Sequence, residues 1–344
     1  MVFSRALTSF CGLAVATAAA ALASTPARPD VQILQPVAFL PSHLASTLRD
    51  PIACLETPSG EQLILDRRGH ALFAVNTART SLRRVLSFGE EAGGIAESNA
   101  LAGGPNGTFA IADAPKGFDR VQWFSAEGKL LGFLDLSDKL VQPKIPGPTL
   151  SQTAGVMQFT GDRFFFALPG RGSLVSEVDL KGRTTRQIGR TRPTGQEQDP
   201  ELHTALNTGF PLIDSSGNLY YVFQAGMPMF RKYDAAGKLV FERHIEGVEI
   251  DRAIEELPAV WPVRSPGDGT HPVVPALVRA AGIDRRGQLW ISLSEPFTYI
   301  YDARGDKIRT VQFNAGTTVS PVSLSFTSTD HVLIAPGCYE YDAR

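Results

Sequence analysis

The side chains in this sequence that could carry chemistry are far apart along the chain. The histidines are His43, His70, His203, His244, His271 and His331. The sequence contains neither a G-x-S-x-G nucleophile elbow nor an H-E-x-x-H zinc motif, so serine-hydrolase and zinc-protease chemistry lack support. A fold that gathers distant residues could still form a metal site, and His203 with His271 is the pair to test first.

Basic residues at loop positions favour an acidic ligand such as a carboxylate, a phosphate or an acidic sugar. Trp261 lies between prolines, where it either stacks on a sugar ring or packs over the fold. For each basic residue alone, a solvated surface charge is the alternative. The ligand-binding hypothesis names Arg67, Lys116, Arg171, Trp261, Arg264 and His271.

The elements that must position these residues come from a pattern that recurs along the chain. An apolar run, a loop, a second apolar or aromatic run, a tight turn ending in Gly and a charged run follow one another. Clear copies are NLYYVFQ…MFRKYDAAGKLVFERHI from Asn218 and QLWISLS…TYIYDARGDKIRTVQF from Gln288. The copies recur every ~43 to 70 residues, a spacing typical of propeller blades or solenoid units.

The composition of each copy predicts strands. Short stretches rich in Val, Ile, Phe, Tyr and Leu alternate with polar residues, and Gly closes the hairpins at Gly128, Gly182, Gly237 and Gly305. A lone hairpin cannot bury its apolar faces, whereas a ring of four-stranded sheets buries them against neighbours. We therefore predict an all-β fold, a six-bladed β-propeller of four-stranded antiparallel blades.

The last copy, HVLIAPGCYEYDAR from His331, has no charged outer strand after it. The segment VQILQPVAFLP, residues 31–41, precedes the first blade and reads as a strand without a blade. We predict that this N-terminal strand completes the last blade and closes the ring. A disordered leader is the alternative.

Two insertions interrupt the repeats, at residues 189–210 and 246–282. The second contains a predicted helix at residues 249–257, ended by Pro258. Loops between successive blades share one face of the disc with the turns between the second and third strands. Because loops on a rigid scaffold usually carry the contacts, we expect ligand binding on this face.

The N-terminus reads as a targeting segment. One positive charge precedes an alanine-rich apolar stretch that ends in an A-x-A signal. We predict a signal peptide at residues 1–23 and a single mature propeller domain at residues 24–344, exported to the periplasm or secreted. The short, alanine-dominated stretch disfavours stable membrane insertion.

Cleavage would remove Cys11 and leave Cys54 and Cys338, an even pair in an oxidising compartment. Strand counting places Cys54 on the innermost strand of blade one and Cys338 in a turn of the adjacent blade six. A disulfide between Cys54 and Cys338 and two buried free thiols are both compatible with this placement.

The net charge of −2 and the pI near 6.3 show no global bias toward nucleic acid, and we expect a monomer. No basic run of five residues occurs, so no nucleic-acid partner is predicted.

The run VLSFGEEAGGIAESNALAGGPNGTFAIADAPKGFDRVQWFSAEGKLLGFL, residues 85–134, resembles the blades of NHL-repeat-like six-bladed propellers. The likeness extends in weaker form over nearly the whole mature chain. Such domains mostly bind proteins or other ligands. Some relatives, similar to gluconolactonase, are hydrolases or lyases with a calcium or zinc ion in the central channel, and that resemblance would assign metal-binding roles to Glu56, Asn207 and Asp214.

Two hypotheses of function follow. The favoured one is an exported noncatalytic propeller, without a cofactor, that binds a protein, peptide, glycan or acidic ligand through its loop-rich face. The alternative is a metal-dependent lactonase or esterase that uses Ca or Zn in the central channel. Fold alone does not separate them, because propellers host both.

Overall fold

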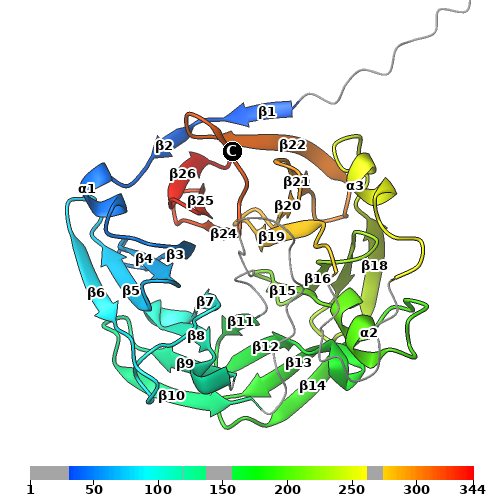
Figure 1. Ribbon diagram of the computed structural model, residues 1–344, viewed down its shortest axis with the longest axis horizontal. Coiled ribbons are helices and arrows are strands. Elements are labelled where there is room, and N and C mark those ends of the chain that lie inside the picture. The colour runs from blue at the N-terminus through cyan, green and yellow to red at the C-terminus, as the bar shows by residue number, and fades with distance from the viewer. Residues whose placement is uncertain (1–30, 118, 137–156, 262–273) are drawn as a thin grey trace, which may run out of the picture. The chain divides into compact units, whose positions relative to one another are not determined.

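The repeats predicted from the sequence fold into antiparallel sheets arranged as the blades of a six-bladed propeller (Figure 1). The computed structural model describes residues 31–117, 119–136, 157–261 and 274–344. Residues Val31–Arg344 form one compact unit. The second strands of the six blades begin close to the predicted positions, at Gln62, Phe109, Arg163, Leu219, Leu289 and His331.

The strands of each blade run from the centre outward in chain order. Blade one contains β3 (Pro51–Glu56), β4 (Gln62–Asp66), β5 (Ala71–Val75) and β6 (Leu82–Leu86). Blade two contains β7 (Ala100–Gly103), β8 (Phe109–Asp113), β9 (Arg120–Phe124) and β10 (Leu130–Asp135). Blade three contains β11 (Met157–Thr160), β12 (Arg163–Ala167), β13 (Ser173–Asp179) and β14 (Thr184–Arg190).

The second half of the ring repeats this order. Blade four contains β15 (Gly209–Ile213), β16 (Leu219–Phe223), β17 (Met229–Tyr233) and β18 (Leu239–His244). Blade five contains β19 (Val278–Ile283), β20 (Leu289–Leu293), β21 (Thr298–Tyr301) and β22 (Lys307–Asn314), with the short β23 (Thr318–Val319) paired to β22. Blade six contains β24 (Ser323–Phe326), β25 (His331–Ala335), β26 (Tyr339–Asp342) and β2 (Pro36–Ala38).

Short helical segments connect the strands. They are α1 (Ser42–Ala45), α2 (Pro200–Leu206), α3 (Asp251–Glu255), η1 (Pro105–Gly107), η2 (Pro115–Gly117) and η3 (Pro169–Arg171). The helix predicted at residues 249–257 is confirmed in shortened form as α3, and α2 was not predicted. In the described part of the chain, no helix has the length and apolar character needed to cross a membrane.

Burial explains why these sequences form blades. The second strands β4, β8, β16 and β20 are buried at every position, as expected for strands covered on both faces. The outer strand β10 instead alternates between half-buried and exposed residues. Each strand thus carries the pattern that its distance from the centre requires.

The hydrophobic core is divided among the interfaces between neighbouring blades. The cluster between blades two and three contains Trp123, Phe164 and Phe166, and the one between blades four and five contains Phe230 and Tyr299. Similar clusters occupy the remaining interfaces, including the one between blades six and one. Every blade therefore depends on both neighbours for burial, and the ring must close to be stable.

The hairpin turns have the backbone conformation that the sequence predicts. Gly128, Gly182, Gly237 and Gly305 all have positive φ angles, between 79° and 87°. In the turn that ends at Gly182, the carboxylate of Asp179 accepts hydrogen bonds from the backbone N–H groups of Lys181 and Arg183, both at 2.9 Å. The acidic residue at the strand end thus holds the turn together.

The N-terminal segment closes the ring, as predicted, but it serves two blades rather than one. β2 pairs antiparallel with β26 and supplies the outer strand of blade six. β1 (Val31–Leu34) instead pairs in parallel with β22 and extends blade five. The single strand predicted for residues 31–41 is therefore corrected to two. Leu34 explains the split, because its side chain packs into the core between blades five and six with Val311 and Phe313.

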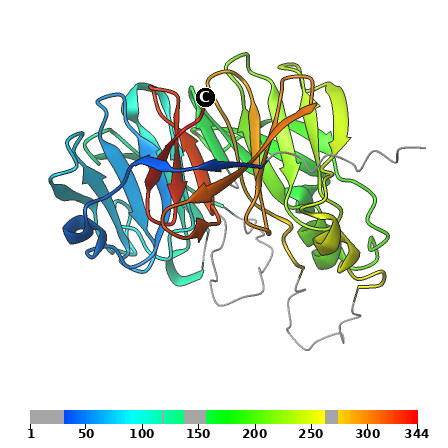
Figure 2. The same ribbon diagram turned by 90° about the horizontal axis from the view of Figure 1, so that it is seen from above.

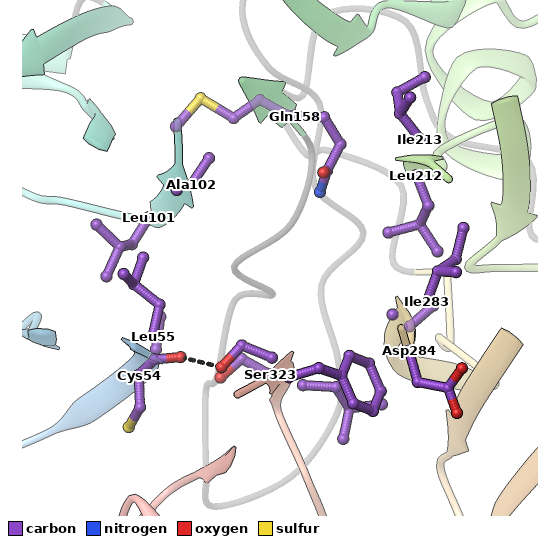
Figure 3. Close-up of a pocket in the computed structure, with 18 of the residues that line it drawn as sticks. Cys54, Leu55, Leu101, Ala102, Gln158, Leu212, Ile213, Ile283, Asp284 and Ser323 are labelled. Carbon is purple, nitrogen blue, oxygen red and sulfur yellow. Dashed lines mark hydrogen bonds between the residues drawn. The ribbon is translucent and has the colours of Figure 1, made fainter. Parts of the chain in front are cut away.

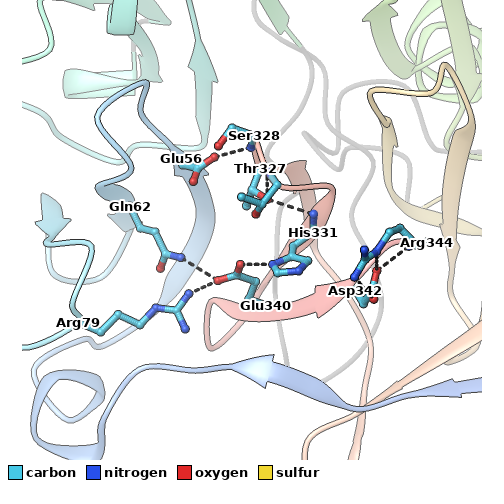
Figure 4. Close-up of polar contacts among 10 residues, drawn as sticks. Glu56, Gln62, Arg79, Thr327, Ser328, His331, Glu340, Asp342 and Arg344 are labelled. Atoms are coloured by element: carbon cyan, nitrogen blue, oxygen red, sulfur yellow. Dashed lines mark hydrogen bonds and ion pairs between the residues drawn. The ribbon is translucent and has the colours of Figure 1, made fainter.

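Side-chain contacts reinforce the junction between blades six and one. Cys54 on β3 is joined by a disulfide to Cys338 in the turn between β25 and β26, with the two Cα atoms 5.8 Å apart. At the same junction the carboxylate of Glu340 accepts a hydrogen bond from the guanidinium of Arg79 (Figure 4). Its Oε1 also lies 2.5 Å from Nδ1 of His331. The first and last blades are therefore held together by a covalent bond and by charged groups.

Candidate functional site

Antiparallel blades give the ring two unlike faces. The turns between second and third strands lie on one face together with the connections between blades, and we call this the loop-rich face. The other turns lie on the opposite face, which we call the hairpin face. Helices α2 and α3 belong to the two long connections on either side of blade four, and both project to the same side of the ring (Figure 2).

These connections enclose a cavity of about 440 Å³ beside blade four, which we call the blade-four pocket. Its lining combines the apolar side chains of Met227, Leu257 and Trp261 with the polar side chains of Arg192, Arg231, Glu242 and His244. Trp261 packs against a small apolar cluster that includes Leu202 and Leu206 of α2. The side chain is thereby held at the edge of the pocket.

Arg192 is the most unusual side chain in this pocket. It is 8% exposed, and its guanidinium donates to the backbone carbonyls of Leu206 at 2.9 Å, Met227 and Ala225. The same group lies 4.4 Å from the centroid of the Phe223 ring. Burial lowers the pKa of Arg192 to about 10, so the side chain remains cationic at neutral pH.

The charges around the pocket do not balance. Arg231 on β17 forms an ion pair with Glu242 on β18, with 2.6 Å between Nε and Oε2. The hydrogen bonds recorded for Arg192 all go to carbonyl oxygens, which are dipoles and carry no net charge. Among the described residues that line the pocket, two guanidinium groups and one carboxylate leave a net positive charge close to the Trp261 ring. Such an arrangement suits an anionic group attached to an apolar or sugar ring.

The structure distributes the predicted ligand-binding residues over several blades. Arg67 donates from Nε to Asp50 Oδ2 at 2.9 Å, and Lys116 lies 3.0 Å from Glu90 Oε2. Hydrogen bonding to Glu90 raises the pKa of Lys116. Arg171 ends η3 in blade three. These three positions lie in turns of three different blades, and η3 contacts α2, the helix against which Trp261 packs.

Two other predicted residues, Arg264 and His271, lie outside the described residues. Of the two histidines proposed as a metal site, His203 and His271, the structure describes only His203, which lies on α2. Its Nδ1 lies 2.7 Å from the hydroxyl of Thr194. This contact ties α2 to the connection that precedes it.

Glu56, Asn207 and Asp214 do not fit a shared metal site. Glu56 ends β3 and accepts from the backbone N–H of Ser328 at 2.6 Å (Figure 4). Asn207 is fully buried before β15, where its carboxamide oxygen accepts from Arg192 N at 2.8 Å.

Asp214 follows β15 and accepts from the N–H groups of Ser216 and Asn218. A five-residue strand at 3.3 Å per residue separates Asn207 from Asp214 by at least ~13 Å. Glu56 belongs to blade one, across the ring from blade four. Within the described ranges, no group of three or more His, Cys, Asp or Glu side chains could hold a metal ion.

Sequence reasoning missed Arg192 and Arg231, which supply the positive charge in the lining of the pocket. Arg192 lies in the insertion GRTRPTGQ, where nothing distinguishes a buried arginine from the exposed ones around it. Arg231 lies in a strand where apolar and polar residues alternate, and this pattern predicts no more than half burial for its side chain. Their proximity follows from the packing of two connections over blade four, which local sequence does not encode.

Comparisons with known proteins give the fold. The sequence matches no protein-family model and no curated protein. Among solved structures, a gluconolactonase of Xanthomonas campestris is similar with a TM-score of 0.50 and 13% identity, over 92% of this chain and 98% of that one. Virginiamycin B lyase of Staphylococcus aureus has a TM-score of 0.48 and 10% identity, over 85% of this chain and 93% of that one. The resemblance to six-bladed propellers is confirmed at the level of architecture.

Proposed function

We propose that this protein is an exported, noncatalytic propeller that binds an acidic ligand through its loop-rich face, at the blade-four pocket. The observation that carries the proposal is the buried guanidinium of Arg192, whose recorded partners are carbonyl groups and a ring face. Removing a charge from water is unfavourable, so a fold keeps such a group where a counter-charge can reach it. An incoming carboxylate would supply that counter-charge.

The neighbouring side chains define what accompanies the anionic group. Trp261 offers a flat apolar surface on which a sugar or aromatic ring can stack. Met227, whose side chain lies on the open side of the pocket, is 48% exposed and can adapt to the ligand. An acidic carbohydrate fits this pocket, because its carboxylate can bind the arginines while the face of its sugar ring stacks on Trp261.

Binding of trigalacturonate, compared with neutral maltotriose, tests this function. Titration calorimetry should detect the acidic sugar and show weaker binding as salt increases. Trp261→Ala and Arg231→Glu should each lower the affinity at least tenfold, because aromatic and arginine anchors dominate such contacts.

Arg304→Glu is the matched control. It makes the same charge change on the hairpin face, at a side chain that is 82% exposed. It should leave binding unchanged apart from a small, salt-sensitive effect. Equal losses from Arg231→Glu and Arg304→Glu, or preferential binding of maltotriose, would contradict the proposed site.

Export is part of the same proposal. The predicted cleavage site and the disulfide between Cys54 and Cys338 both suit an oxidising compartment. When the full chain is expressed in a bacterial host, the processed protein should begin at Ser24. Recovery of an unprocessed chain from the cytoplasm alone would contradict export.

A further inference from the structure

A second cavity, on the axis of the ring, has a different chemistry from the blade-four pocket. It measures about 320 Å³ and is lined by residues of the six innermost strands. Ile213 and Ile283 are the last residues of β15 and β19, and Asp284 and Arg285 follow in the next turn. The cavity therefore extends to the hairpin face.

Apolar and polar groups contribute about equally to the exposed lining of this cavity, and both remain accessible to solvent. Leu55, Leu101, Ile213, Ile283 and Phe326 come from five different blades, and each is only half-buried. In contrast, the apolar side chains between blades are almost completely buried. The ring thus retains apolar surface inside a concave site that a ligand could cover favourably.

One hydroxyl group in this cavity is left without a partner. Ser323 on β24 is 9% exposed, and its Oγ makes no hydrogen bond within the described part of the chain. Its neighbour Ser325, two residues further, donates to the carbonyl of Cys54 at 2.6 Å. The Oγ atom itself is buried, so the Ser323 hydroxyl lies behind the lining and is not offered to a ligand in the cavity.

The amide of Gln158 is a polar group that does face the cavity. Its side chain extends from β11 toward the open centre of the cavity, facing the apolar side chains of the other blades (Figure 3). An amide can donate and accept, so Gln158 can bind a carbonyl or hydroxyl oxygen.

The charged residues at the rim are already engaged. The carboxylate of Asp284 accepts from the N–H groups of Arg286 and Gln288 and from Trp290 Nε1 at 3.1 Å. Arg285 lies 3.8 Å from Asp330. Among the described residues that line the cavity, the charged groups are therefore paired and offer no free counter-charge to an ionic ligand.

We propose that the central cavity binds a small, neutral molecule that combines an apolar surface with a carbonyl or hydroxyl group. The volume lies near the lower end of known small-molecule sites, which begin at roughly 300 Å³. This site is separate from the blade-four pocket in position, lining and ligand charge. The two proposals therefore succeed or fail independently.

The first experiment uses the neutral fluorophore N-phenyl-1-naphthylamine. Its fluorescence should rise saturably on titration with the protein, with one molecule bound per chain. Gln158→Trp, which fills the cavity, should weaken binding at least tenfold. Gln158→Glu places a charge there with little change of volume, and it should also weaken binding if the tryptophan variant does not fold.

Trp261→Ala is the matched control, because it alters the blade-four pocket and leaves the axis untouched. This variant should bind the fluorophore like the parent. Unchanged binding in a folded Gln158→Trp variant would overturn the proposal, and so would loss of binding in Trp261→Ala.

The second experiment tests the polar group of the ligand. Displacement of the fluorophore should be about fivefold more effective with 1-indanone than with indane, since one neutral hydrogen bond contributes about that factor. Gln158→Leu should reduce this difference, because it removes the amide that binds the carbonyl oxygen. Equal displacement by the two compounds in the parent protein would overturn the assignment of Gln158.

Discussion

Removal of the disulfide between Cys54 and Cys338 should produce one of the largest losses of stability that two small substitutions can cause in this protein. The bond joins residues separated by 284 positions in the sequence. In the chain-entropy model, closing a loop of that length lowers the entropy of the unfolded chain by about 19 cal/mol/K, which corresponds to about 5–6 kcal/mol at 25 °C.

The folded geometry indicates that most of this free energy contributes to the stability of the protein. The two Cα atoms are 5.8 Å apart, within the usual range for a disulfide, so the backbone accommodates the bond where it stands. Cys54 and Cys338 are 2% and 0% exposed. The double variant Cys54→Ala, Cys338→Ala keeps small apolar groups at both positions and therefore reports mainly on the lost cross-link.

Urea unfolding followed by tryptophan fluorescence measures the difference. The double variant should unfold at a lower urea concentration and with a steeper dependence on urea, because its unfolded chain is less compact. The parent protein treated with a reducing agent should behave like the double variant, and the reducing agent should not affect the double variant. Mass spectrometry of unreduced peptides should find the two cysteines joined.

Two outcomes would refute this reasoning. One is a pair of free thiols that can be alkylated in the unreduced protein. The other is an intact bond whose removal changes the free energy of unfolding by less than about 1 kcal/mol, since the entropy term then has no counterpart in the unfolded state.

Three further predictions concern the ring and its buried charges. A chain that starts at residue 42 should be at least ~4 kcal/mol less stable than one that starts at residue 31. The shorter chain exposes the edge of β26 and loses the buried side chains of Leu34 and Leu40. Equal melting temperatures of the two chains would contradict the role of residues 31–41 in closing the ring. Arg120→Met should lower the free energy of unfolding by about 3–5 kcal/mol, because it leaves the buried carboxylate of Asp113 without the guanidinium at 2.7 Å. Arg304→Met, at an exposed ion pair, should lower it by less than ~1 kcal/mol. Similar losses for both variants in urea unfolding would show that burial does not decide the effect. Burial opposes ionisation of Glu177, but its hydrogen bonds with Arg163 and Arg186 prevail and hold its pKa below 4.5. The ionised carboxylate therefore stabilises the fold above that pH, and this contribution is lost as the pH falls through the lowered pKa of the folded state. Glu177→Gln should therefore flatten the acid side of a stability-versus-pH curve, and an unchanged curve would exclude Glu177 as a source of acid sensitivity.

The sequence by itself determined the architecture. Alternating apolar runs define the strands, and the glycines after short turns define the hairpins, because both signals depend on residues close together in the chain. The missing outer strand of the last repeat and the unassigned strand of residues 31–41 together predicted closure of the ring. The same counting placed Cys54 and Cys338 on adjacent blades, without settling whether they are bonded.

Tertiary structure alone decided which of the chemically capable residues meet. Arg67 and Lys116 looked like a shared rim, but Asp50 and Glu90 lie beside them in space and pair with them. Arg192 looked like any loop arginine, yet packing buries it against the Phe223 ring and the carbonyl groups of Leu206 and Ala225. Gln158 became notable only because its strand places it at the axis of the ring, where it faces apolar side chains of other blades. Local sequence fixes hydrogen bonds and turns along the chain, whereas the partner of a buried charge or hydroxyl depends on how distant blades pack, and that packing is a property of the closed ring.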